Sequence, residues 1–251
     1  MTNITSVQLG KNTRKSIREA LATGTLTTAI IPLGSTEQHN EHLAMEQDAA
    51  GIEYIANQVA ERIFPQAIVT PVVSVGSAPH HMHHPGTLSL RPETLILVLH
   101  DIVTSLEKHG FQYIVVLNGH GGNVRALGNQ LDDIKPSDLT GFLFLSYWDV
   151  VEHDFVTKHL EKSAIFPGHA GIFETSFALA AFPENVDMDA EYPESFIKNG
   201  EPWVSRDHLL FDESRRSSAT IGTQFIQHIV DQLKQRINIL YGQDGQENER
   251  Y

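Results

Sequence analysis

Four apolar segments, separated by helical patterns, place the strongest constraint on the fold of this chain. They cover residues 26–33, 67–75, 111–117 and 141–146. Continuous apolar runs of this length are typical of strands that are buried on both faces, as in parallel sheets. The sequence therefore predicts an α/β fold with a mostly parallel central sheet and helices on both of its faces. Pro71, inside the second segment, places that strand at an edge or at an irregularity.

The helices are predicted from apolar residues that recur at helical spacing, with glycine or proline near their ends. Expected helices cover residues 13–23, 49–64, 92–109, 123–133, 150–160, 168–182 and 222–240. Residues 183–220 are left unassigned, apart from a short strand near Trp203. The 251 residues contain no internal repeat, so we expect a single domain over residues 1–251, with loose termini at 1–12 and 242–251.

The composition excludes several classes of function. The formal net charge of −13 argues against nucleic acid or an anionic membrane as the main partner. The absence of cysteine excludes disulfides and thiolate chemistry, so any metal must be bound by His, Asp or Glu. No apolar run approaches membrane-spanning length, and the N-terminus lacks the apolar region of a secretion signal, so we expect a cytoplasmic protein.

The residues that follow the first strand indicate a metal site. Residues 34–48 carry six His, Asp and Glu side chains, and Glu37 and His39 are two apart, so both point the same way from an extended segment. Asp48 lies where the next helix is expected to begin, so its carboxylate either turns back toward them or caps that helix. His120 follows the third strand in a glycine-rich turn, where it is either a ligand or a helix cap.

These side chains are expected to converge, because the carboxyl ends of parallel strands meet at one edge of a sheet. Two carboxylates and two imidazoles suit Zn²⁺, Mn²⁺ or Fe²⁺, and Asp48 has the two oxygens needed to bridge a pair of ions. Such a pair would share a hydroxide and polarise a carbonyl group. The glycines beside His120, including Gly121, let the backbone approach a ligand closely, but they lack the third glycine of a dinucleotide fingerprint.

Four further side chains are candidates for the site. Glu174 is either a first-turn carboxylate favoured by the helix dipole or a ligand that completes a second metal site. In the second case His169, five residues before it, would pass protons to a leaving nitrogen. Among the histidines at 80–84 we select His81 as the one that touches substrate, and Trp148 is either a core residue or a wall of the site. The sequence contains neither a Gly-x-Ser-x-Gly elbow nor a P-loop.

Four ordered motifs resemble those of the creatininase (creatinine amidohydrolase) family. They are IIPLGSTEQHNEHLAMEQD at 30–48, HPGTLSL at 84–90, LNGHGGN at 117–123 and HAGIFETS at 169–176. The resemblance implies a three-layer α/β fold, a two-metal site, hydrolysis of non-peptide C–N bonds in cyclic or linear amides, and homo-oligomers, commonly hexamers. Glu37, His39, Asp48 and His120 match the metal ligands of that family, and His169 matches its proposed catalytic histidine.

The chain departs from the family pattern at four places. Asn40-Glu41 replaces the usual Gly-Pro, Ala44 replaces a proline, and His84 replaces an aromatic residue. Members that act on creatinine carry a ligand Glu where this chain has Gly122, so either Glu174 supplies the missing oxygen or the second metal site is weak. The Gly-Gly version resembles the branch that includes formylamino-pyrimidine deformylases and the peptide-trimming enzyme of mycofactocin maturation.

The main hypothesis is a metal-dependent amidohydrolase, in which a metal-bound hydroxide attacks a small cyclic or linear amide. One alternative is a formylamino-pyrimidine deformylase. Another is a catalytically silent protein that binds a metal or ligand on the same fold. The expected cofactor is a divalent metal, two ions per subunit, and the expected partners are a small-molecule amide and further copies of the chain.

Overall fold

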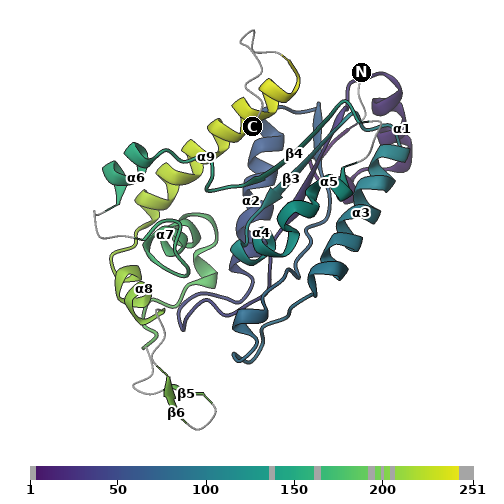
Figure 1. Ribbon diagram of the computed structural model, residues 1–251. Coiled ribbons are helices and arrows are strands. Elements are labelled where there is room, and N and C mark those ends of the chain that lie inside the picture. The colour runs from purple at the N-terminus through teal and green to yellow at the C-terminus, as the bar shows by residue number, and fades with distance from the viewer. Residues whose placement is uncertain are drawn as a thin grey trace.

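A parallel sheet lies at the centre of the computed structural model, which describes residues 4–135, 139–160, 165–191, 196–198, 201–203 and 207–242 (Figure 1). Its four strands run in the order β2-β1-β3-β4. They are β1 (Thr28–Leu33), β2 (Ala67–Val69), β3 (Tyr113–Asn118) and β4 (Gly141–Ser146). The second strand lies at the edge of the sheet, as Pro71 indicated, and is shorter than predicted.

The register of the sheet brings the loops after its strands to one edge. Leu33 of β1 pairs with Asn118 of β3, and Asn118 pairs with Ser146 of β4, so these three strands end level with one another. Val73, beyond β2, forms an isolated bridge with Leu33 and continues the same edge. The segments that carry the predicted site residues therefore start side by side.

Helices cover both faces of the sheet, and the predicted three-layer α/β arrangement is confirmed. One face packs against α2 (Gln47–Arg62), α7 (Ile172–Ala181) and α9 (Ala219–Leu240). The other packs against α1 (Arg14–Ala22), α3 (Pro92–Lys108), α4 (Gly121–Leu127) and α5 (Leu131–Ile134). Because successive strand residues point to opposite faces, Ile30 belongs to the first core and Ile31 to the second.

Local signals explain where several of these helices begin and end. Thr13 precedes α1, and its hydroxyl accepts a hydrogen bond from the backbone N–H of Ser16 in a capping box. Pro92 is the first residue of α3, where its missing N–H is not needed. The helix expected at 123–133 is divided into α4 and α5, because Gly128 adopts a φ of +45° between them.

The remaining elements include several that the sequence left unassigned. The weak helix expected at 150–160 is shorter, α6 (His153–His159), and α8 (Asp207–Ser214) was not predicted. The strand expected near Trp203 is confirmed as β6 (Glu201–Trp203), which pairs antiparallel with β5 (Phe196–Lys198). No helix in the described ranges has the length and hydropathy needed to cross a membrane.

The first residues are held more firmly than the loose arm that we expected. Gln8 bridges Val69 of β2 in parallel, and Ile4 is buried. These residues are held because β2 is an edge strand, whose outer backbone groups are available to pair with the N-terminal segment. Of the expected loose tail, only Gly242 is among the described residues.

Candidate metal centre

All five predicted metal ligands lie at the carboxyl edge of the sheet. Glu37 and His39 come from the loop after β1, and Asp48 is the second residue of α2. His120 lies between β3 and α4, and Glu174 is in the first turn of α7. Each of the five is buried, although the chain segments that supply them are far apart in sequence.

Short distances connect the carboxylates with the two imidazoles. His120 Nδ1 lies 3.1 Å from Glu37 Oε1 and 2.9 Å from Asp48 Oδ2. His39 Nε2 lies 3.1 Å from Asp48 Oδ1 and 4.0 Å from Glu174 Oε2. Asp48 therefore contacts both imidazoles, one with each carboxylate oxygen.

The interpretation of Asp48 as a helix cap is wrong, and His120 has the position of a cap without its hydrogen bond. The residue that precedes α2 is Glu46, and Asp48 lies inside the first turn. His120 does precede α4, but its side chain makes no capping hydrogen bond. Glu174 is a first-turn carboxylate, as one interpretation expected, and accepts a hydrogen bond from Ala170 N. It also lies 4.0 Å from His39 Nε2, so its role as a metal ligand stays a prediction.

Hydrogen bonds behind the two imidazoles decide which nitrogen of each carries a proton. His39 Nδ1 lies 3.2 Å from the carbonyl oxygen of Glu37, and His120 Nε2 lies 3.0 Å from the carbonyl oxygen of Ser77. A carbonyl only accepts, so both outer nitrogens are N–H donors. The inner nitrogens, His39 Nε2 and His120 Nδ1, are thereby left to bind a cation, which is the usual arrangement of histidine ligands.

The carboxylates of the cluster favour a positive charge at these inner nitrogens. Burial alone would lower the pKa of His39 and of His120, but the neighbouring carboxylates raise both pKa values to about 10. Burial is outweighed in Asp48 by the charge of His39, which lowers the pKa of that carboxyl well below its usual range. Burial raises the pKa of Glu174 to about 7 and also raises that of Glu37.

The donor set fits a divalent metal ion. A neutral nitrogen lone pair that faces a carboxylate oxygen at about 3 Å is repelled, so a proton or a metal ion has to lie between them. In addition, Glu37 Oε2 is buried and accepts no hydrogen bond from the described residues. Buried anionic oxygens of this kind are costly unless they bind a cation. Carboxylates with imidazoles are ligands that zinc, manganese and iron accept.

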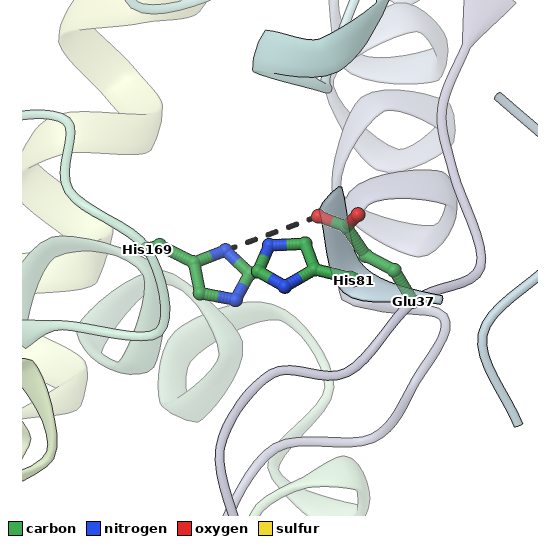
Figure 2. A group of neighbouring side chains, drawn as sticks. All are labelled: Glu37, His81 and His169. Carbon is green, nitrogen blue, oxygen red and sulfur yellow. Dashed lines mark ion pairs between the residues drawn. The ribbon is translucent and has the colours of Figure 1, made fainter. Parts of the chain in front are cut away.

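Two further histidines lie beside the cluster. Figure 2 shows His81 and His169 with their rings stacked beside the Glu37 carboxylate, at a centroid distance of 4.7 Å and an interplanar angle of 18°. His169 Nδ1 lies 3.9 Å from Glu37 Oε1. Burial lowers the pKa of His81 to about 3 and that of His169 well below its usual value, so both are neutral.

A cavity of about 250 Å³ opens in front of the carboxylates. All three residues predicted to contact substrate, His81, Gly121 and Trp148, line it, together with Glu37, Asp48, His120, His169 and Glu174. Trp148 also packs against the hydrophobic core, so the two interpretations of this residue are both correct. The expected substrate residues therefore line the same cavity as four of the five expected ligands, and His39 lies behind it.

Gly122 has a structural role that its sequence position did not reveal. A Cβ atom at this residue would lie 2.1 Å from Ser77 O and 2.2 Å from His120 Nε2, the two atoms of the hydrogen bond behind His120. No side chain at position 122 is compatible with this placement of His120. The third carboxylate of the cluster is instead that of Glu174, which comes from α7.

Two other departures from the family pattern are accommodated by the backbone. Asn40 has a φ of +55°, a left-handed conformation that asparagine tolerates better than most residues, so it can replace a glycine there. Ala44 N donates a hydrogen bond of 3.0 Å to the carbonyl oxygen of Asn185, which a proline could not do. His84 lies behind His81, at a ring centroid distance of 6.1 Å.

Sequence reasoning missed three residues of the site. Gln38 is buried and contacts both His81 and His169, Ser77 supplies the carbonyl behind His120, and Arg125 lines the cavity. The position of Gln38 between two ligands was the available signal for that residue. For Ser77 there was none, because a backbone carbonyl acts regardless of its side chain.

Comparison with known proteins places the chain among hydrolases. A family model described as creatininase, creatinine amidohydrolase, matches residues 11–237. The creatinine amidohydrolase of Pseudomonas putida is 33% identical over 198 residues, which cover 73% of this chain and 75% of that protein. The mycofactocin precursor peptide peptidase of Mycobacterium ulcerans is 28% identical over 230 residues, which cover 85% of this chain and 85% of that protein.

Solved structures show the same fold. A manganese form of creatininase superposes with a TM-score of 0.77 at 27% identity, covering 94% of this chain and 98% of that one. A zinc-containing variant of creatininase gives a TM-score of 0.75 with the same identity and coverage.

Proposed function

This chain belongs to the creatininase family of hydrolases, and on that basis we propose that it is a metal-dependent amidohydrolase. It would cleave a non-peptide C–N bond in a small cyclic or linear amide. The observation that carries the proposal is the cluster of three buried carboxylates and two imidazoles whose inner nitrogens face them. Four of the five side chains of this cluster line a cavity of about 250 Å³, so a small substrate would reach the carboxylates.

The proposed ligands are the five residues of the cluster. They are Glu37, His39, Asp48, His120 and Glu174. Asp48, which contacts both imidazoles, would bridge two divalent ions, and zinc, manganese and iron are all candidates. The chemistry that such ions supply when bound is Lewis-acid activation of a water molecule and of the amide carbonyl.

The protein's own side chains would hold the substrate and manage its protons. We assign to His169 a contact with the departing nitrogen: its imidazole is neutral and its Nδ1 lies 3.9 Å from Glu37 Oε1, so it would relay to that nitrogen a proton released by the activated water. Glu174 is a second candidate for proton transfer, because its carboxylate also lines the cavity. His81, Gly121 and Trp148 would position the substrate and exclude water.

The choice of substrate depends on the relatives and on position 122. The two relatives named above act, by their names, on creatinine and on a precursor peptide, so family membership alone does not select one. Gly122, which leaves no room for a side chain, favours a substrate other than creatinine. Deformylation of a formylamino-pyrimidine is therefore retained as the second candidate, and oligomer formation and a cytoplasmic location remain expectations.

The test is a screen of zinc- and manganese-loaded protein against creatinine, other cyclic amides and a formylamino-pyrimidine nucleotide. Release of formate would identify a deformylase, and ring opening would identify a cyclic amidase. Glu37→Ala and His120→Ala should abolish both bound metal and turnover. His100→Ala, a half-exposed histidine on α3, serves as the control and should change neither. Full metal content in both site variants would refute the ligand assignment.

A further inference from the structure

The buried amide of Gln38 makes three hydrogen bonds behind the cavity, two of them to histidines that line it. Its Nε2 lies 3.0 Å from His81 Nδ1 and 2.9 Å from His169 Nε2. Its Oε1 lies 2.9 Å from the backbone nitrogen of Asn40. Gln38 is itself 6% exposed, so water does not substitute for these partners.

The backbone of Asn40 determines which end of the amide is which. A backbone N–H only donates, so the atom that faces Asn40 N has to be the oxygen of Gln38. The other end is then the NH₂ group, which has two N–H donors and no acceptor. Each of the two histidine nitrogens that face it must therefore offer a lone pair. Turning the amide over would lose the hydrogen bond from Asn40.

We infer that Gln38 is a positioning residue that fixes His81 and His169 in opposite tautomers, so that both present an N–H to the cavity. His81 carries its proton on Nε2, and His169 carries its proton on Nδ1. Figure 2 shows that these two nitrogens lie on the side of the rings toward the Glu37 carboxylate. The two histidines thus give the cavity a pair of hydrogen-bond donors beside the proposed ligands.

The hydrogen-bond partner behind each ring divides the four imidazoles of the site into two kinds. His39 and His120 have carbonyl oxygens behind them, so their inner nitrogens are free to bind a cation. His81 and His169 have an NH₂ group behind them, so their inner nitrogens carry protons. The grouping of Glu37 with His81 and His169, although their ligand atoms lie within 4.8 Å of one another, is therefore not a metal site.

Paired N–H donors are suited to an oxygen atom that bears negative charge. The ligand they recognise is a carbonyl oxygen on which charge develops, or a carboxylate beside the scissile bond. Arg125, which also lines the cavity and donates to His80 at 3.2 Å, adds positive charge on this side. This part of the inference rests on the proposed function, whereas the tautomers do not.

The tautomers can be measured directly by two-bond ¹H–¹⁵N correlation spectra of zinc-loaded protein labelled with ¹⁵N-histidine. His81→Asn and His169→Asn variants assign the two rings by the signals that disappear. We expect His81 to show the Nε2–H pattern and His169 the rarer Nδ1–H pattern. Either ring in the opposite tautomer, or protonated at both nitrogens, overturns the inference whether or not the protein hydrolyses any amide.

Substitution of Gln38 provides the second measurement. Gln38→Glu keeps the acceptor for Asn40 N but turns the donor end into an acceptor, so the protons should move to His81 Nδ1 and His169 Nε2. Gln38→Leu removes both ends and should leave mixed tautomers. The control is Gln227→Glu, an exposed glutamine on α9, which should leave both patterns unchanged. A purely structural role for Gln38 would lower Tm without moving the protons.

Activity then tests the role of the donor pair in the reaction. On the amide substrate found in the screen, Gln38→Glu should lower kcat by about 100-fold, the usual effect of losing a donor to developing charge, while bound zinc stays constant. Unchanged kcat with altered tautomers would refute the role of the pair in catalysis. Absence of any hydrolysis would refute the proposed function and leave the spectroscopic result standing.

Discussion

Replacement of Gly122 by alanine tests how the protein orients His120. The added Cβ would lie 2.1 Å from Ser77 O and 2.2 Å from His120 Nε2. Carbon atoms pack best at about 3.5–4.0 Å, so these two atoms would have to withdraw by roughly 1 Å or more. The 3.0 Å hydrogen bond between them could not survive this displacement.

The expected loss in metal affinity follows from the role of that bond. Removing an outer hydrogen bond of a histidine ligand typically weakens metal binding by about 10- to 100-fold. At about 1.4 kcal/mol for each factor of ten, this is roughly 1.4–2.8 kcal/mol of binding free energy. Overpacking should lower the free energy of unfolding of the metal-free protein by about 1–3 kcal/mol as well.

The assay is a calorimetric titration of metal-free protein with zinc, accompanied by thermal unfolding. Gly121→Ala is the matched control, because a Cβ at Gly121 meets no atom within 4 Å. It should bind zinc as tightly as the unaltered protein. If the Kd of Gly122→Ala for zinc lies within about twofold of that of Gly121→Ala, the two binding free energies differ by less than roughly 0.5 kcal/mol. That result would show that the hydrogen bond to Ser77 O does not orient His120.

Three further predictions follow from the charges in the cluster. Because carboxylates raise the pKa of His39 and His120 to about 10, both imidazoles are doubly protonated at pH 8 when no metal is bound. Zinc binding should therefore release protons, and zinc affinity should increase as pH rises. Calorimetry in buffers of different ionisation enthalpy measures the release; heats that do not depend on the buffer would contradict it. Chelation should lower Tm, since metal at 1,000 times its Kd stabilises by about 4 kcal/mol, and an unchanged Tm would show that the cluster binds none. Glu174→Gln keeps the acceptor for Ala170 N but removes a charge, so the number of bound metal ions per subunit should fall from two to one. Elemental mass spectrometry measures this number, and retention of two ions would exclude Glu174 as a ligand.

The fold and most of the cluster could be predicted because they depend on periodicity and on strand ends. Glu37 and His120 follow strands that pair in parallel, and that alone brings them to one edge of the sheet. His42, three residues after His39, instead contacts α7, where its Nε2 lies 2.8 Å from Thr175 Oγ1.

What could not be predicted depends on backbone groups and on long-range packing. The proton positions on His39 and His120 are set by two carbonyl oxygens, and carbonyls leave no signature in a sequence. The need for Gly122 to lack a side chain arises from Ser77, 45 positions earlier in the chain. The contact of Gln38 with two histidines from distant loops likewise depends on the folded structure.

The central claim is that the inner nitrogens of His39 and His120, with three carboxylates, bind divalent metal. The most direct test is an anomalous difference map from crystals grown with zinc, recorded on both sides of the zinc absorption edge. The account predicts a signal between Asp48 and the two imidazoles, and none between His81 and His169. A signal confined to the His81–His169 side, or density for zinc elsewhere only, would contradict it.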